Sequence, residues 1–108
     1  MSAKLPDAVK TYFDADKSTD AGALVGAFSD TAIVHDEGET HRGQEPIRIW
    51  WLEAKRKYNH TAEPISATAD GKEISVLANV SGNFLNSPAE LRFRFVLEQD
   101  KITELEIG

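Results

Sequence analysis

The segment LRFRFVLE, residues 91–98, alternates large apolar side chains with mostly charged ones, and this pattern constrains the fold more than any other stretch. Successive side chains of a β-strand point to opposite faces of its sheet, so a period of two predicts a half-buried strand. The apolar set is Leu91, Phe93, Phe95 and Leu97, and the outer set is Arg92, Arg94, Val96 and Glu98. The segment therefore predicts a sheet with one buried and one exposed face.

The rest of the second half also predicts strands. Residues 60–69 and 73–81 favour two strands joined at Asp70-Gly71, a dipeptide typical of tight hairpins. The loop GNFLNSP precedes the alternating segment, and a turn at Gln99-Asp100 leads into a last strand over residues 101–107. We expect the second half to be all β.

The first half begins with two helical patterns. The first helix ends near residue 16 or 17, and its apolar stripe consists of Leu5, Val9, Tyr12 and Phe13. Asp20 can cap a second, shorter helix, which carries Leu24, Val25 and Phe28. Both helices are thus expected to bury one side.

A hairpin and a third helix follow. Residues 31–36 predict a strand, and Glu37-Gly38 offers a tight turn into a return strand that Gly43 ends. Pro46 fits the first turn of a helix that runs to Tyr58. The side of this helix expected to be apolar carries Ile47, Trp50, Trp51, Ala54 and Tyr58.

Together these elements predict an α+β fold, with three N-terminal helices packed on a strongly curved antiparallel sheet. Long strands twist, so the sheet should curl around the helices and form a cone. The interior of such a cone is a shape that forms pockets. A chain of 108 residues fits one domain, over residues 1–108.

Charge and composition exclude several classes of function. The net charge of −6 disfavours a nucleic-acid partner, because phosphate binding needs a basic face. Cysteine is absent, which excludes disulfides and thiolate metal sites. No apolar run approaches the roughly 20 residues of a membrane span, and residues 1–10 lack the apolar core of a signal peptide. We therefore expect a cytoplasmic protein with no membrane partner.

Four segments carry a resemblance to a known family: TYFDADKSTDAGALVGAF, SDTAIVHDEG, HRGQEPIRIWW and SGNFLNSPAELRFRFVLEQDKITELEI. In this order, the chain resembles the SnoaL-like branch of the nuclear transport factor two-like superfamily. The resemblance implies the cystatin-like α+β barrel of that superfamily, a homodimer formed through the sheet, and no cofactor. It leaves the activity open, because the fold serves polyketide cyclases, ketosteroid isomerases, dehydratases, epoxide hydrolases and binding subunits.

Ketosteroid isomerases provide the sharpest correspondence. Aligned without a gap through the first two helices, Tyr12 falls on their oxyanion-donating tyrosine and Asp36 on their proton-shuttling aspartate. Their third element, a protonated carboxylic acid, falls near Leu91, where this chain has only Glu90 beside it on the opposite face. The resemblance thus implies catalytic roles for Tyr12 and Asp36. Because the third acid is missing, the chain departs from the pattern of steroid isomerases.

The residues themselves allow two interpretations of Asp36 and of Tyr12. Alternation places Asp36 on the side of Val34, at the rim of the cone, where apolar cover raises a carboxyl pKa and suits proton abstraction. Alternatively, Asp36 caps the turn that follows it. Tyr12 either donates its hydroxyl to a ligand oxygen or bonds a backbone carbonyl in the core.

Further ligand-binding candidates lie on the expected inner surface: Val34, Trp51, Phe84 and Phe93. Adjacent helical residues point about 100° apart, so one of Trp50 and Trp51 should line the cone and the other should pack at its seam. Phe84 lies in a loop, where it would close the open end of the cone or pack against a partner subunit.

The three histidines, His35, His41 and His60, are expected to be exposed. Their spacing matches no zinc motif, and alternation sends neighbouring side chains to opposite faces, so we predict no metal site. A histidine could still act as a base or a donor, because its ordinary pKa is about 6.5.

Three functional interpretations stay open. The first is a cofactor-independent isomerase, cyclase or dehydratase that acts on a small apolar carbonyl compound, with Asp36 as general acid or base. The second is a non-catalytic ligand-binding module or dimeric adaptor. The third is a cone filled by its own aromatic side chains. In each case the broad outer face around Arg92 and Arg94 predicts a homodimer through the sheet.

Overall fold

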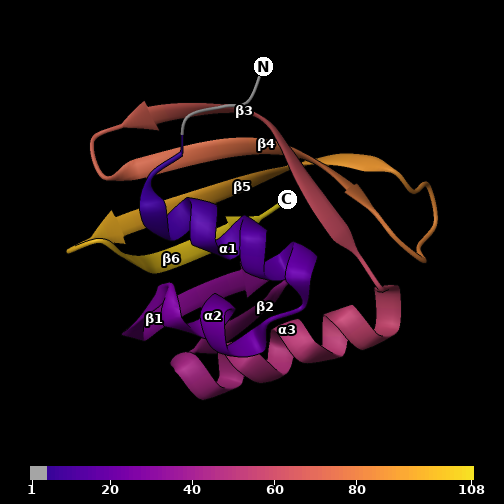
Figure 1. The fold of residues 1–108 in the computed structure, drawn as a ribbon, viewed down its shortest axis with the longest axis horizontal. Coiled ribbons are helices and arrows are strands. Elements are labelled where there is room, and N and C mark those ends of the chain that lie inside the picture. The colour runs from indigo at the N-terminus through magenta and orange to yellow at the C-terminus, as the bar shows by residue number, and fades with distance from the viewer. Residues whose placement is uncertain (1–4) are drawn as a thin grey trace.

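The computed structural model describes residues 5–108, and three helices and six strands form an α+β fold over this range (Figure 1). The helices are α1 (Asp7–Ser18), α2 (Ala21–Gly26) and α3 (Gln44–Tyr58). The strands are β1 (Phe28–Asp36), β2 (Glu39–Arg42), β3 (Thr61–Asp70), β4 (Glu73–Ser81), β5 (Ala89–Glu98) and β6 (Lys101–Ile107). Residues 1–4 of the predicted domain lie outside the described range. Only α1 and α2 precede the sheet, since α3 follows the first hairpin.

The six strands form one curved sheet in the order β2-β1-β6-β5-β4-β3. The prediction of an antiparallel sheet is wrong for one pair, because β1 runs parallel to β6, with Val34 opposite Leu105. Sequence signals identify hairpins between consecutive strands, whereas this pair joins the two ends of the chain. The sheet is also not closed into a barrel, because β2 and β3 form its two edges.

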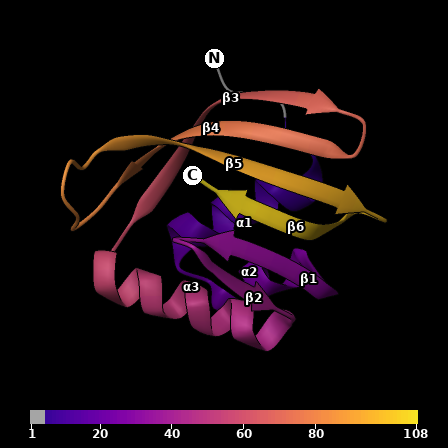
Figure 2. The same ribbon diagram turned by 180° about the vertical axis from the view of Figure 1, so that it is seen from behind.

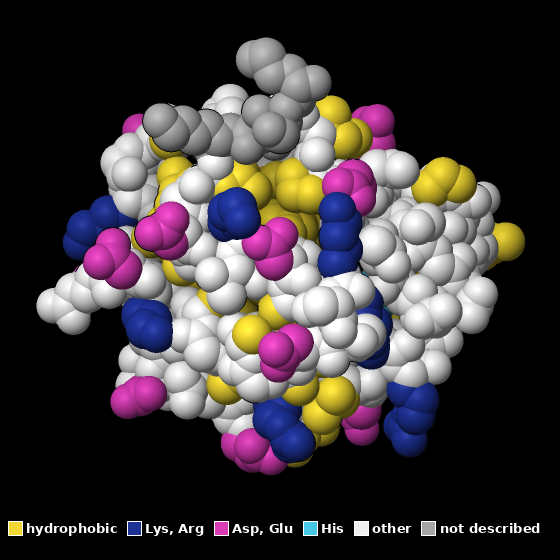
Figure 3. Space-filling view, in the orientation of Figure 1, with side chains coloured by type: hydrophobic (Ala, Val, Ile, Leu, Met, Phe, Trp, Pro, Cys, Tyr) yellow, Lys and Arg dark blue, Asp and Glu magenta, His cyan; other side chains and the backbone are white. Residues whose placement is uncertain are grey.

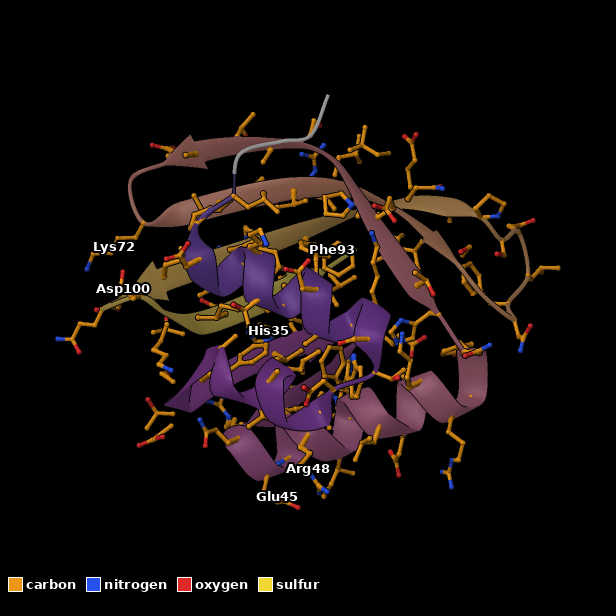
Figure 4. The ribbon with its side chains drawn as sticks, viewed as in Figure 1. His35, Glu45, Arg48, Lys72, Phe93 and Asp100 are labelled. Atoms are coloured by element: carbon orange, nitrogen blue, oxygen red, sulfur yellow. The ribbon has the colours of Figure 1, made fainter. Side chains whose placement is uncertain are left out.

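Strand β3 bends across one end of the molecule (Figure 1). Its register with β4 shifts between Pro64 and Ser66, which inserts a bulge. Proline lacks a backbone N–H, and an edge strand tolerates this loss. The hairpin tips at Lys72 and Asp100 lie together at one end of the sheet, and the loop between β4 and β5 lies at the other (Figure 4).

A buried aromatic cluster holds α1 against the sheet. Tyr12 and Phe13 of α1 pack on Phe93 and Phe95 of β5, with ring centroids 5.3–6.1 Å apart. Phe93, labelled in Figure 4, is buried, with 4% of its surface exposed. Phe28 was predicted on the second helix but begins β1, where it pairs with Ile102. Its spacing from Leu24 fits a helix, and the pairing with β6 overrides that local pattern.

The face that carries the helices has a mixed charge. On the side shown in Figure 3, the described Lys and Arg side chains are interspersed with Asp and Glu side chains. None of the helices in residues 5–108 has both the length and the apolar character that crossing a membrane requires.

Candidate functional site

A cavity of about 210 Å³ opens between the helices and the curved sheet. Its apolar wall combines α3, β3, β4, β5 and β6 through Ala54, Ala62, Val80, Leu91, Phe93 and Ile107. A dry engineered cavity of about 150 Å³ binds benzene, so this volume accommodates a ligand of one or two rings. The interpretation that aromatic side chains fill the interior is therefore wrong.

Asp36 reaches the cavity from the last position of β1. The carboxylate Oδ2 accepts a hydrogen bond of 3.0 Å from Nε1 of Trp50. Burial raises the pKa of Asp36 above its ordinary value, while the Trp50 hydrogen bond and a backbone hydrogen bond from Glu37 oppose this rise. Asp36 thus faces the cavity and also contacts its own turn, in which Glu37 and Gly38 both have positive φ.

Tyr12 faces the same cavity from α1, and only 2% of its surface is exposed. Burial, followed by the negative charges of Asp16 and Asp36, raises the pKa of the Tyr12 hydroxyl well above its ordinary value. Tyr12 therefore stays protonated and can donate to an oxygen atom of a ligand.

The remaining predicted ligand-binding residues divide into two pairs. Phe84 and Phe93 line the cavity, whereas Val34 and Trp51 are not among its lining residues. Val34 is fully buried in the core, and Trp51 is 1% exposed. Trp50 takes the cavity position, because adjacent residues of a helix point about 100° apart and Trp51 turns toward α1.

The mouth of the cavity joins three elements that the sequence did not group. The Tyr58 hydroxyl at the end of α3 donates to Oε1 of Glu37 at 3.2 Å. The Tyr58 ring packs perpendicular to Phe84, with ring centroids 6.1 Å apart. Glu37, predicted in the turn that follows β1, is exposed and also lines the cavity.

A buried carboxylate, Asp16, is the main feature that the sequence analysis missed. Asp16 lines the cavity and is 1% exposed. Oδ1 accepts a hydrogen bond of 2.9 Å from Nε1 of Trp51, and Oδ2 accepts one of 3.3 Å from the backbone N–H of Ala62. Nζ of Lys55 lies 3.4 Å from Oδ1. The available signal was its spacing: Asp16 is four residues after Tyr12, on the apolar stripe of α1.

His60 lies beside Asp16 and also lines the cavity. Nδ1 of His60 is 3.5 Å from Oδ1 of Asp16, and 17% of the His60 side chain is exposed. The expectation of an exposed side chain is therefore wrong for His60, and also for His41, whose side chain is 20% exposed and whose buried Nε2 has no hydrogen-bond partner among the described residues. The His41 ring lies 6.0 Å from the Trp50 ring of α3, and His60 lies against Asp16 of α1. The local pattern around each histidine does not reveal these contacts. Among residues 5–108, no group of His, Asp or Glu side chains is arranged to hold a metal ion.

The backbone around His60 is held from three sides. Asn59 ends α3 in the left-handed conformation, with φ of 49°, and so turns the chain toward β3. Nζ of Lys55 donates to the carbonyl oxygen of His60. The backbone N–H of Asn83 donates to the carbonyl of Tyr58 at 2.6 Å, which brings the end of β4 against this corner.

Gly82 permits that close approach. A Cβ atom at Gly82 would lie 2.6 Å from the carbonyl oxygen of Tyr58 and 3.0 Å from Cα of His60. Gly82→Ala is therefore expected to destabilise the protein by about 1–3 kcal/mol, because both neighbours are backbone atoms. Urea unfolding measures this loss. Gly26→Ala is the matched control, because a Cβ there meets nothing within 4 Å, and equal stability of both variants would contradict the expectation.

The cavity is acidic. Three carboxyl residues line it, Asp16, Asp36 and Glu37, and no Lys or Arg is among its described lining residues. The ammonium group of Lys55, 3.4 Å from Oδ1 of Asp16, offsets the negative charge of that carboxylate. A negatively charged ligand would therefore meet repulsion, whereas a neutral one would not.

A crystal structure from Sinorhizobium meliloti, of a protein assigned as a polyketide cyclase, superposes on this fold with a TM-score of 0.94. The two sequences are 43% identical over 96% of this chain and 95% of the other. The chain belongs to the SnoaL-like branch of the nuclear transport factor two-like superfamily. No family model matches the sequence, and no curated protein does.

Two more distant structures share the fold of this SnoaL-like protein. A protein from Catenulispora acidiphila with a ketosteroid isomerase-like fold, in complex with trimethylamine, is 20% identical over 97% of this chain and 86% of its own, with a TM-score of 0.85. A computationally designed 17-OHP binder is 13% identical over 94% and 87%, with a TM-score of 0.81. At these identities the likeness concerns the fold alone.

Proposed function

We propose that this SnoaL-like protein is a cofactor-independent enzyme that transfers a proton on a small, uncharged, apolar carbonyl compound. One observation carries the proposal: the Asp36 carboxyl and the Tyr12 hydroxyl both face one apolar cavity of about 210 Å³. A carboxylate under partial apolar cover is a suitable base for a carbon acid, and a protonated phenol is a suitable donor to the oxygen of an enolate.

The proposed step balances without any added reagent. The carboxylate of Asp36 takes the proton from a carbon next to the carbonyl group, and the electron pair of the C–H bond moves into the carbonyl. The Tyr12 hydroxyl donates a hydrogen bond to the resulting enolate oxygen. Return of the proton to a different carbon is isomerisation, and attack of the enolate on a second carbonyl carbon is cyclisation.

The comparisons support this proposal at the level of the family. The protein at 43% identity is assigned as a polyketide cyclase, and enolate attack on a carbonyl is the chemistry of such a cyclisation. Neighbours in complex with trimethylamine and designed to bind 17-OHP favour a cavity that takes small molecules. The acidic lining narrows the ligand to one without negative charge.

The test uses 2-indanone, a neutral bicyclic ketone, as the probe. Wild-type protein is incubated with the ketone in D₂O, and the loss of the protons next to the carbonyl is followed by proton NMR. We expect exchange that is proportional to protein concentration and faster than in the same buffer with heat-denatured protein. Exchange at the buffer rate would overturn the proposal for this compound class.

A second candidate, a non-catalytic binding module, is favoured by Leu91. This residue lines the cavity at the position where the resemblance to ketosteroid isomerases places a carboxylic acid. A binding module would retain 2-indanone affinity in an Asp36→Asn variant within a few-fold and would exchange none of its protons. The two candidates therefore differ in the exchange assay.

We further propose that two copies associate through the sheet face that α1 and α2 do not cover, which Figure 2 shows. On this face Arg94 lies 3.1 Å from Glu106, 3.6 Å from Glu73 and 3.8 Å from Glu104. His35, labelled in Figure 4, lies 3.0 Å from Glu104. These charges are paired within one chain, so a second copy would not need to neutralise them.

Light scattering is the measurement for this dimer. We expect about twice the chain mass of 11.9 kDa, because the uncovered face is broad and self-complementary contacts between two-fold related copies are common. A mass of one chain across a wide concentration range would contradict the expectation.

A further inference from the structure

The mechanism above leaves one group of ionisable side chains in the cavity without a role. Asp16 and His60 both line the cavity, and Lys55 lies behind them. We propose that His60 is a second proton-transfer residue of the cavity and that Asp16 is the positioning residue that orients it. This inference rests on the proposed function and adds a base to it.

Asp16 has the geometry of a fixed acceptor. Its two carboxylate oxygens accept hydrogen bonds from Trp51 at 2.9 Å and from the backbone of Ala62 at 3.3 Å. These donors come from α3 and β3, so the carboxylate is held between two elements that pack against α1. Nζ of Lys55, 3.4 Å away, stabilises its negative charge in a site where only 1% of Asp16 is exposed.

The position of His60 against this acceptor selects one tautomer. Nδ1 faces Oδ1 of Asp16 at 3.5 Å, so the proton of the neutral ring belongs on Nδ1. The other nitrogen, Nε2, is then unprotonated and can accept a proton. A separation of 3.5 Å is long for a hydrogen bond, and such contacts commonly shorten when a ligand binds.

The electrostatics of the site favour the neutral ring. Burial lowers the pKa of His60, the charge of Asp16 opposes this effect, and the charge of Lys55 adds to it. The charged groups beside the ring are Asp16 of α1 and Lys55 of α3. Because the pKa of His60 is lowered, the ring is neutral and available as a base at neutral pH. Asp36 differs, because burial raises its pKa and so increases the fraction that carries a proton.

Two proton carriers on different elements permit removal and delivery at separate positions of the ligand. The Asp36 carboxylate takes the proton from a carbon next to the carbonyl, as in the step above, and the C–H electron pair becomes the enolate that Tyr12 stabilises. Nε2 of neutral His60 accepts a proton from the solvent, and the resulting imidazolium, paired with Asp16, delivers that proton to a carbon of the enolate. The Asp36 carboxyl group then loses its proton to water, so that both residues return to their starting states.

The first test is the tautomer of His60 in the wild-type protein, read from the nitrogen shifts of a ¹⁵N NMR spectrum at pH 7.5. We expect the form with the proton on Nδ1. The form with the proton on Nε2 would overturn the inference, because the nitrogen free to act as a base would then face Asp16. This test needs no variant and no ligand.

The second test is the exchange of 2-indanone protons in D₂O by His60→Gln. Its rate is expected to fall about 10²-fold, the lower end of what an acid–base group contributes. Added imidazole is expected to restore part of the rate of a His60→Ala variant, which a merely structural role would not allow. His35→Gln is the matched control, because His35 faces the outer side of the sheet beside Glu104, and its rate should equal that of the wild type.

The outcomes separate this inference from the proposed function. An unchanged rate in His60→Gln, together with loss of exchange in Asp36→Asn, would overturn the role of His60 and leave the proposed function intact. Absence of exchange in the wild type would overturn both. Failure of imidazole to restore any exchange to a folded His60→Ala variant would reduce His60 to a structural residue and overturn the inference.

Discussion

Asp36→Asn is expected to slow the exchange of 2-indanone protons by about 10²–10⁴-fold, the usual contribution of a general acid–base group. Asparagine has the shape of aspartate, and its carbonyl oxygen can still accept the hydrogen bond of 3.0 Å from Trp50. The substitution therefore removes the proton acceptor and leaves the surrounding contacts in place. The proton NMR exchange assay measures the effect, and a full-rate Asn variant would remove Asp36 from the mechanism.

The stability of the same variant supplies the control for folding. Burial raises the pKa of Asp36 above its ordinary 3.8, so the folded state favours the protonated form. As pH rises from 3.8 through the raised pKa, ionisation of Asp36 becomes unfavourable in the folded state and the protein loses stability. Asn cannot ionise, so the melting temperature of Asp36→Asn at pH 7 should equal or exceed that of the wild type. A marked decrease would mean that the loss of rate reflects unfolding.

Asp16→Ala is expected to lower the free energy of unfolding by about 3–5 kcal/mol, as is usual when one partner of a buried ion pair is removed. The variant leaves Lys55, whose side chain is 10% exposed, without its negative partner. It also leaves the indole N–H of Trp51 without an acceptor in a site that is 1% exposed. Urea unfolding at pH 7 measures the loss.

Two matched variants separate these contributions. Asp14→Ala removes an exposed carboxylate that pairs with Lys10 on the same helix, and its expected loss is below about 1 kcal/mol. Asp16→Asn keeps an acceptor for Trp51 and removes only the charge, so its stability should lie between those of wild type and Asp16→Ala. A loss for Asp16→Ala no larger than that for Asp14→Ala would show that Asp16 is not a structural centre.

The predicted elements agree with the structure where local patterns are strong. The alternation in residues 91–98 identified β5, and Glu37-Gly38 and Gln99-Asp100 lie at the turns where they were predicted. Alternation also placed Asp36 on the side of Val34, and the structure brings the carboxyl group to the cavity. Phe28 shows the limit of this reasoning, because its spacing fits a helix as well as a strand.

The choice between Trp50 and Trp51 shows the same limit at the site. Two adjacent tryptophans on one helix fix an angle of about 100° between them, but the direction of the helix relative to α1 decides which one reaches the cavity. That direction places Trp51 against Asp16 and Trp50 against Asp36. Asp16 was missed for a related reason: an acid on an apolar stripe is identified as buried only when its donors on α3 and β3 are known.

The sequence by itself determined the order of helices and strands, the buried face of β5 and the side of β1 on which Asp36 lies. These properties depend on neighbouring residues and on the 3.6- and 2-residue periods of the backbone. The tertiary structure alone decided the parallel pairing of β1 with β6, the open sheet and the contacts among Asp16, Lys55 and His60. Such contacts join residues far apart in the chain, and their energies depend on burial that no local pattern specifies.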